Sequence, residues 1–419
     1  MQSRTLSTGA LALLLSVSAG CNRLLDVDNP GRVPVDAIGD PALVPALEAA
    51  AIQSFQCAAV AYAATAGVLS GEYIVSTIFV NANIWGWRGV EIKTEPGTCT
   101  VARATTSLGY YAPLQFARYQ LDDAADRLAG FTDAQVPNRA KLQAEMAAYG
   151  GYTYLLLGEG FCNMAINNGP LMQRAEVFAI AEQRFTAALT FAATANDASL
   201  RNMAYVGRAR TRLNLGNLAG AAADAAQVTA GFVRNAEYSE TAPIRENRLY
   251  NLNIRNDFLS VGPNYRNLTV QGTTVADPRV KVTNTGRIAA DALTPLWLQQ
   301  KFVGSGAAPL AIASYAEAQL ILAEAIATTD PQGARDAINR VRTAGGVPVL
   351  NGSEGTDLGA LVIEERRRQL FSEGQRYYDM LRKNIPFPTG VNHKGQSYGP
   401  VTCVPLPDVE TQNNPNLKT

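Results

Sequence analysis

Histidine is almost absent from this 419-residue chain, which holds a single one, His393. No Cys-x-x-Cys pair occurs either, so we predict no zinc site and no other metal or cofactor. The Gly-x-Ser-x-Gly elbow, the P-loop and the His-Glu-x-x-His motif are also missing, and one histidine cannot serve most catalytic triads. The sequence therefore indicates a protein that binds and does not catalyse.

An excess of charge of either sign is lacking as well. The chain has 36 basic and 36 acidic side chains, so nothing suggests a nucleic-acid partner. We find no apolar stretch after residue 20 that is long enough to cross a bilayer as a helix, so any membrane attachment is expected to be an anchor. Abundant alanine favours helices, while 35 glycines and 21 prolines predict long loops between them.

The start of the chain resembles a bacterial export signal followed by a lipid-attachment site. Arg4 precedes an apolar stretch over residues 11–17, and the small residues 18–20 (SAG) precede Cys21. We therefore expect residues 1–20 to be removed as a lipoprotein signal peptide and Cys21 to carry the lipid. The alternative is a soluble periplasmic protein that is cut elsewhere.

Four further cysteines follow: Cys57, Cys99, Cys162 and Cys403. In an exported protein four cysteines allow two disulfides with three possible pairings, and buried free thiols are the alternative. We favour Cys57 with Cys99 and Cys162 with Cys403, because each pair could join a helix or its end to a nearby loop.

Apolar periodicity predicts a mainly all-α scaffold. Helices are expected over residues 42–66, 103–128, 138–157, 176–195, 201–215, 218–229, 315–328, 331–343 and 358–383. Glycines 158 and 160 are expected near the end of the third helix. Residues 21–41 read as a tether and residues 42–419 as one helical domain, with a long loop over 67–100.

Two features modify that plain helical picture. Small residues at helical spacing over residues 204–225 resemble a tetratricopeptide repeat, although an ordinary helical hairpin would also explain them. Residues 232–305 read as a loop-rich insertion, with short β-like stretches at 267–270 and 280–283.

The C-terminal third resembles the RagB/SusD family through several ordered motifs. These are residues 315–325 (YAEAQLILAEA), 334–345 (ARDAINRVRTAG), 363–382 (IEERRRQLFSEGQRYYDMLR), 405–407 (PLP) and 414–417 (NPNL). The third resembles the pattern E-R-R-x-E-L-x-x-E-G-x-R-x-x-D-L-x-R, with Gln369 at a usual glutamate. The resemblance is densest over residues 315–417, whereas the N-terminal half matches only in layout.

The charged residues of that third motif lie three, four or seven positions apart, so opposite charges can meet along one helix. We expect a structural ion network of Glu365, Arg366, Glu373, Arg376, Asp379 and Arg382. The adjacent Glu364 and Glu365 point in different directions on a helix, which makes them unsuited to acid–base catalysis.

Family resemblance implies an outer-membrane lipoprotein, displayed at the cell surface, that captures a nutrient for a SusC-type TonB-dependent transporter. Many members bind glycans, which need flat apolar faces beside hydrogen-bonding groups. Five residues are candidates for that contact: Tyr73, Trp85, Trp87, Arg88 and Trp297. The alternative is that Trp85 and Trp87 fill the core beneath their loop.

Two rival classes of function remain open. A tetratricopeptide-type adaptor that binds another protein would explain the helical pairs without a small ligand. A degradative enzyme would require a catalytic site that the sequence does not provide.

Overall fold

The computed structural model describes residues 39–99, 107–352 and 354–417. The predicted signal peptide, Cys21 and the tether up to residue 38 lie outside the described residues. Residues 44–417 belong to one compact unit, and the short turn η2 (Pro41–Leu43) belongs to the unit before it. Helices dominate and the strands are short, so the mainly helical class expected from the sequence is confirmed.

The helices follow the predicted order, with three departures besides the helix break described below. The expected loop over 67–100 contains a helix, a further short helix lies near the C-terminus, and the helix expected over 103–128 begins at Tyr111. The helices are α2 (Val44–Leu69), α3 (Val80–Gly86), α4 (Tyr111–Ala129), α5 (Arg139–Gly160), α6 (Arg174–Thr194), α7 (Ala198–Asn214), α8 (Leu218–Ala225), α9 (Tyr315–Ile326), α10 (Pro331–Ala344), α11 (Leu358–Gln369), α12 (Gln375–Arg382) and α13 (Asp408–Asn413). Short helical turns are η3 (Pro243–Arg245), η4 (Tyr250–Arg255), η5 (Pro263–Tyr265) and η6 (Pro415–Leu417).

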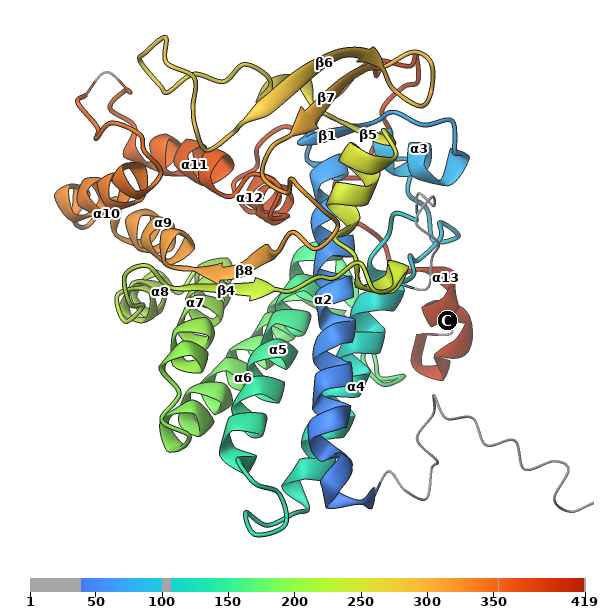
Figure 1. Ribbon diagram of the computed structural model, residues 1–419, viewed down its shortest axis with the longest axis vertical. Coiled ribbons are helices and arrows are strands. Elements are labelled where there is room, and N and C mark those ends of the chain that lie inside the picture. Colours follow the sequence, from blue (N-terminus) through green and yellow to red (C-terminus); the bar gives the residue numbers. More distant parts are fainter. Residues whose placement is uncertain (1–38, 100–106, 353, 418–419) are drawn as a thin grey trace, which may run out of the picture. The chain divides into compact units, whose positions relative to one another are not determined.

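Helix α2, blue in Figure 1, packs against α4, α5 and α12. Glu48 is its only charged residue, and every residue from Cys57 to Leu69 is buried. With the turn before it, the span Pro41–Leu69 is long and apolar enough to cross a membrane, contrary to our expectation for this part of the chain. Its contacts on several sides identify α2 as a core helix.

Helix α5 ends at Gly160, which confirms the end expected near Gly158 and Gly160. Both glycines serve close packing, because an added Cβ atom would lie 2.5 Å from Phe178 at Gly158 and 2.5 Å from Tyr110 at Gly160. Gly207 of α7 likewise lies against the ring of Phe185 of α6. Small residues therefore let these helices approach closely, as the tetratricopeptide-like pattern predicts.

Our prediction of one long helix over residues 358–383 is wrong, because the structure has two helices there. The chain breaks between α11 and α12, where Ser372 and Gly374 adopt positive φ angles of 66° and 82°. Only glycine fits the second position without a clash, because a Cβ atom there would lie 2.9 Å from the Cα atom of Ala63 in α2. The break lets α12 turn onto α2.

Short strands form four antiparallel pairs among the described residues. They are β1 (Tyr73–Val75) with β5 (Leu259–Val261), β2 (Asn163–Met164) with β3 (Met172–Gln173), β4 (Val233–Ala236) with β8 (Leu310–Ser314), and β6 (Val282–Ile288) with β7 (Pro295–Gln299). The predicted insertion over residues 232–305 thus contains β4 to β7. Its expected stretch at 280–283 partly overlaps β6, whereas 267–270 forms only an isolated bridge from Thr269 to Ala276.

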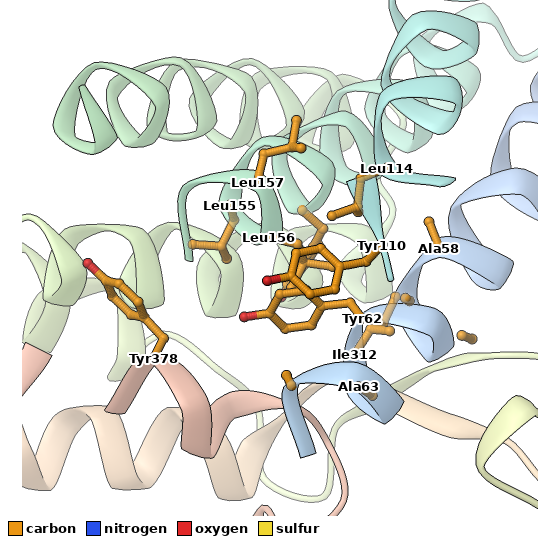
Figure 2. Close-up of a cluster of buried hydrophobic side chains, with 14 of the residues drawn as sticks. Ala58, Tyr62, Ala63, Tyr110, Leu114, Leu155, Leu156, Leu157, Ile312 and Tyr378 are labelled. Atoms are coloured by element: carbon orange, nitrogen blue, oxygen red, sulfur yellow. The ribbon is translucent and has the colours of Figure 1, made fainter. Parts of the chain in front are cut away.

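The main hydrophobic core lies where α2, α4 and α5 meet strands β1, β5 and β8. Figure 2 shows Tyr62 of α2 beside Tyr110, and their ring centroids are 5.1 Å apart in an edge-to-face arrangement. Three consecutive leucines of α5, Leu155 to Leu157, are buried around this pair. Because aromatic rings contribute large apolar areas, this cluster fixes the helices that carry the surface features described next.

Candidate functional site

The structure places Tyr73 and Trp85, two of the residues predicted to contact a ligand, in the hydrophobic core. The Tyr73 hydroxyl lies 2.6 Å from the Ser372 hydroxyl oxygen, to which it is hydrogen-bonded. Trp85 is only 4% exposed, and its ring packs 6.0 Å from that of Tyr110. The geometry thus favours the alternative that Trp85 fills the core, since a buried ring cannot offer its face to a solute.

The remaining three candidates do not form one surface either. Arg88 is buried, and its Nη2 donates hydrogen bonds to the backbone oxygens of Pro388 and Gly399. Trp87 and Trp297 are partly exposed, and the Arg266 guanidinium lies 5.2 Å from the Trp297 ring. The five residues therefore split between the core and separate surface positions.

A different part of the surface carries a hollow of about 640 Å³, which is large enough for a small oligosaccharide. It lies between α2, the first half of α4, the turn after β2 and helix α13. The residues that line it include Gln53, Ser54, Cys57, Cys99, Tyr111, Gln115, Phe116, Arg118, Tyr119, Asn167, Asn168, Ile244 and Glu410. We refer to it as the α4 hollow.

Two aromatic side chains form the open edge of the α4 hollow. Phe116 is 58% exposed and Tyr119 is 57% exposed. They lie three positions apart on α4, so both point from one face of that helix. Large aromatic side chains exposed at a concave site often mark a binding site. Their rings offer flat faces on which a ring-shaped ligand can stack.

Polar groups also line the α4 hollow. The Tyr111 hydroxyl donates a hydrogen bond to Glu410 of α13, and burial raises the pKa of Tyr111, so this phenol stays protonated at neutral pH. Asn167 and Asn168 adopt left-handed φ angles of 51° and 57°, which asparagine tolerates better than most residues.

The C-terminal Asn-Pro-Asn-Leu motif holds that asparagine turn in place. The Asn414 side-chain nitrogen donates to the Gly169 backbone oxygen at 2.8 Å, and the Asn416 side-chain nitrogen donates to the Asn168 backbone oxygen at 2.6 Å. A motif that supports the family resemblance therefore shapes the part of the α4 hollow that Asn167 and Asn168 line.

Sequence reasoning missed Phe116 and Tyr119. One signal was available: the buried residues of α4 include Leu114, Ala117 and Leu121, so the two aromatics fall on the solvent side of the apolar stripe. The contributions of Asn168 and Glu410 had no signal in the sequence, because they reach the hollow through turns far apart in the chain.

The structure pairs Cys57 with Cys99 and Cys162 with Cys403, which are the pairs favoured from the sequence. The Cα atoms are 6.1 Å and 5.3 Å apart, within the range of disulfides. The first bridge lies in the wall of the α4 hollow.

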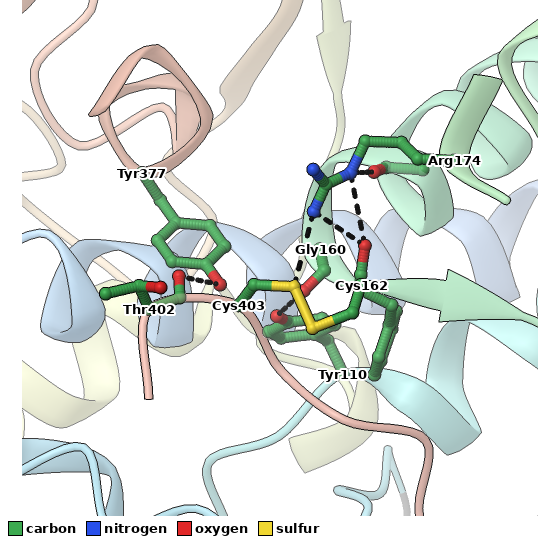
Figure 3. Close-up of a disulfide and its surroundings, with 9 residues drawn as sticks. Tyr110, Gly160, Cys162, Arg174, Tyr377, Thr402 and Cys403 are labelled. Carbon is green, nitrogen blue, oxygen red and sulfur yellow. Dashed lines mark hydrogen bonds between the residues drawn. A yellow bond between two sulfur atoms is a disulfide. The ribbon is translucent and has the colours of Figure 1, made fainter. Parts of the chain in front are cut away.

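Figure 3 shows the second bridge beside Arg174, whose Nη2 donates to the Phe161 oxygen at 2.8 Å. In the same view the Tyr377 hydroxyl donates to the Thr402 oxygen at 3.0 Å. The bridge fastens the C-terminal segment to the residues after α5, and the Tyr377 bond fastens the same segment to α12.

Most residues of the predicted ion network do form ion pairs. These pairs connect different secondary-structure elements instead of following one helix. Glu365 accepts hydrogen bonds from Arg342 at 2.8 Å and Arg279 at 2.5 Å. Arg366 donates to Asp379 at 2.9 Å, across the break between α11 and α12.

The other members also join separate elements. Arg382 pairs with both Asp379 and Glu324, and Glu373 pairs with Lys301. Burial by itself raises the pKa of Asp379, but Arg366 and Arg382 together lower it below its usual range. Arg376 makes no ion pair with any described residue, which departs from our expectation.

The network is too tightly paired to supply a catalytic acid. Breaking one partner would leave an unpaired buried charge, which costs about 3–5 kcal/mol, so the network is best understood as fixing the geometry of α9, α11 and α12. Among the residues that the structure describes, no group of three His, Cys, Asp or Glu side chains is placed to hold a metal ion.

Comparison with known proteins supports the family resemblance. The model of the SusD family matches residues 182–419 of this chain. Curated proteins give no match. A SusD superfamily protein from Bacteroides fragilis is 15% identical, with a TM-score of 0.64 over 91% of this chain and 99% of that chain.

Two further solved structures share the fold. Surface glycan-binding protein A from Bacteroides uniformis is 15% identical, with a TM-score of 0.64 over 89% of this chain and 98% of that chain. Surface glycan-binding protein A from Bacteroides thetaiotaomicron, in complex with laminarihexaose, is 14% identical, with a TM-score of 0.65 over 90% of this chain and 98% of that chain. The family model covers more than half of the present sequence, and the chain therefore belongs to the SusD family.

Proposed function

We propose that this protein is a nutrient-binding lipoprotein of a bacterial outer membrane, and that it captures a glycan or oligosaccharide in the α4 hollow. The observation that carries the proposal is the pair of exposed aromatics, Phe116 and Tyr119, at a mainly apolar hollow of about 640 Å³ that also has a few polar side chains in its lining. Solved structures with the same fold include surface glycan-binding proteins.

The chemistry of the hollow suits a neutral sugar chain. A pyranose ring has one apolar face, which can stack on Phe116 or Tyr119, and a rim of hydroxyls that need both donors and acceptors. Gln53, Asn167 and Glu410 line the hollow and provide amide and carboxylate groups of that kind. The basic Arg118 is already engaged by Gln115 at 2.8 Å and Asp122 at 3.2 Å. Among the described residues that line the hollow, a strongly acidic ligand therefore meets no free cation.

The proposed cellular role follows from the family. SusD family members are generally associated with the outer membrane, and a SusC-type TonB-dependent transporter is the proposed partner. We propose that lipid on Cys21 holds the protein at the surface, and that the bound solute passes from the hollow to the transporter. No catalytic turnover is part of this proposal.

Binding measurements on purified protein test the site. Titration calorimetry against a panel of neutral oligosaccharides should find a ligand. Replacing both Phe116 and Tyr119 by alanine should weaken its binding by about 10-fold or more, as expected for aromatic hot spots. Phe79→Ala is the matched control, because Phe79 is a partly exposed aromatic outside the α4 hollow.

The outcomes separate the site from the function. If only the Phe79 variant loses binding, the solute sits elsewhere and the assignment of the hollow fails, although the glycan-binding role stands. If no oligosaccharide binds and none is turned over, the glycan role itself fails. Recovery of a large barrel protein with the tagged chain, after mild detergent extraction, tests the transporter partnership separately.

A tetratricopeptide-type adaptor is the second candidate. The close packing of Gly207 against Phe185 supports that comparison, but it describes how the helices meet and offers no ligand groove by itself. Capture of a peptide tail by the α6–α8 pairs, with no affinity for any sugar, would favour the adaptor.

A further inference from the structure

Arg88 is a buried cation that has no acidic partner among the described residues. Its side chain is 4% exposed, and it lies just after α3 against the C-terminal segment. The guanidinium carbon is 5.4 Å from the Phe387 ring centroid and 5.0 Å from that of Tyr398. Its backbone φ of 55° is in the left-handed region, which is unfavourable for arginine and shows that the surroundings hold it firmly.

Only part of this guanidinium is satisfied by the protein. Nη2 donates to the oxygens of Pro388 at 2.7 Å and Gly399 at 3.0 Å. Nε and Nη1 are fully buried, and no protein atom in the described residues accepts a hydrogen bond from either. An arginine with unused donors and no counter-charge is costly in the interior, because the low polarity there penalises an uncompensated charge.

A small cavity of about 20 Å³ lies beside Arg88. Its lining includes Val68, Val75, Asn83 and His393. The volume is enough for one particle of the size of a water molecule or slightly larger.

The polar groups around the cavity are largely committed to other contacts. The Asn83 amide nitrogen donates to the oxygens of Thr77 and Phe79, and its oxygen accepts from Lys394. His393 Nε2 is bonded to the Val75 oxygen. Lys394 is itself paired with Asp291, so none of these groups neutralises Arg88.

We propose that this cavity binds a monatomic anion, which is chloride under ordinary solution conditions. The N–H groups at Nε and Nη1 of Arg88 hold the ion. The ion supplies the missing counter-charge and accepts both unused hydrogen bonds. Because Arg88 also contacts Phe387, Pro388, Tyr398 and Gly399, the ion fastens the C-terminal segment to the turn after α3. The site is separate from the α4 hollow and does not depend on the proposed sugar ligand.

Thermal unfolding in two salts tests the proposal on the purified protein. The midpoint is measured in sodium chloride and in sodium gluconate at equal ionic strength, because gluconate is too large for the cavity. We expect chloride to raise the midpoint by about 1–3 °C, since an ion that binds only the folded state stabilises it. The rise should saturate with chloride concentration.

Variants assign the effect to this residue. Arg88→Gln should abolish the difference between the two salts, whereas Arg127→Gln, at a half-exposed arginine of α4 that pairs with Asp123, should retain it. If Arg88→Gln does not fold, crystals of the unmodified protein soaked in bromide decide the question. An anomalous peak within hydrogen-bonding distance of Arg88 Nε and Nη1 supports the site.

Two results would overturn the proposal. Equal midpoints in chloride and gluconate would mean that water alone occupies the cavity. Bromide peaks confined to the protein surface would lead to the same conclusion.

Discussion

At the scale of single residues, burial decides which aromatic side chains can meet a ligand. Tyr73, Trp85 and Tyr110 are rings that the core uses, whereas Phe116 and Tyr119 are rings that it leaves in solvent. The amino-acid type is similar in both groups, so type alone does not indicate function. The face of the helix on which an aromatic lies is the informative property.

Replacing Trp85 by alanine should destabilise the fold by about 3–5 kcal/mol, because it removes a large buried side chain and leaves a cavity. Urea unfolding followed by circular dichroism measures the change. Phe116→Ala is the control and should shift the free energy of unfolding by about 0.5 kcal/mol or less, as is usual for exposed positions. A Trp85→Ala protein of unchanged stability that binds no sugar would restore the ligand role for this residue.

Glu72 gives a pH prediction at the same scale. Burial raises its pKa to about 7, against 4.5 for the ordinary group, and the Ser372 backbone nitrogen donates to its carboxylate at 3.0 Å. Between about pH 4.5 and 7 the folded state therefore holds a proton that the unfolded state has lost. Stability falls as pH rises through this window, because the folded state binds more protons there.

The variant Glu72→Gln removes that titration while keeping the shape of the side chain. Its stability should decline less than that of the parent from pH 5 to pH 8, with the difference growing by roughly 1–3 kcal/mol across the range. Urea midpoints of both proteins at several pH values check the slope. Parallel curves would show that Glu72 ionises normally in the folded state.

At the scale of elements, the sequence predicted the positions of helices well, but it did not predict where a helix is interrupted. Apolar periodicity predicted the bounds of α2, α9 and α10 to within a few residues. Each of these helices has either an apolar stripe beside a polar face or apolar residues on all sides. The break between α11 and α12 was missed, since residues 363–382 keep a helical pattern throughout. At this break Gly374 adopts a left-handed φ and packs against Ala63 of α2, a residue about 300 positions away, and no local pattern reveals that contact.

The substitution Gly374→Ala tests this explanation. It combines a left-handed φ of 82° with a clash against α2, so we expect a loss of more than about 2 kcal/mol in the free energy of unfolding. Gly390 is a matched control, because its φ is 77° but an added Cβ atom meets nothing within 4 Å. Gly390→Ala should cost only about 1 kcal/mol. Equal losses in the two variants would remove the argument from packing.

At the scale of the whole molecule, the α4 hollow is assembled from segments that the chain order keeps apart. Its walls come from residues 53–57, 98–99, 111–119, 165–168, 244 and 410. The C-terminal motifs identified the family, yet their part in the hollow is indirect: Asn414 and Asn416 hold the turn that contains the lining residue Asn168. The fold was therefore predictable from ordered motifs, while the site required the three-dimensional arrangement.

Attachment to the membrane is the last prediction at this scale. The small residues before Cys21, preceded by an apolar stretch, indicate cleavage and acylation there, and Cys21 lies outside the described residues. Acyl chains contribute about 0.8 kcal/mol per buried methylene, so two or three chains bind a bilayer firmly, whereas α2 is committed to the core. Mass spectrometry of the membrane fraction should find a chain that begins at Cys21 with added lipid mass. Cys21→Ser should release the protein from membranes without changing the proposed sugar binding, because the lining of the hollow begins at Gln53 among the described residues. A Cys21→Ser protein that stays in the membrane fraction would contradict the anchor and require another mode of attachment.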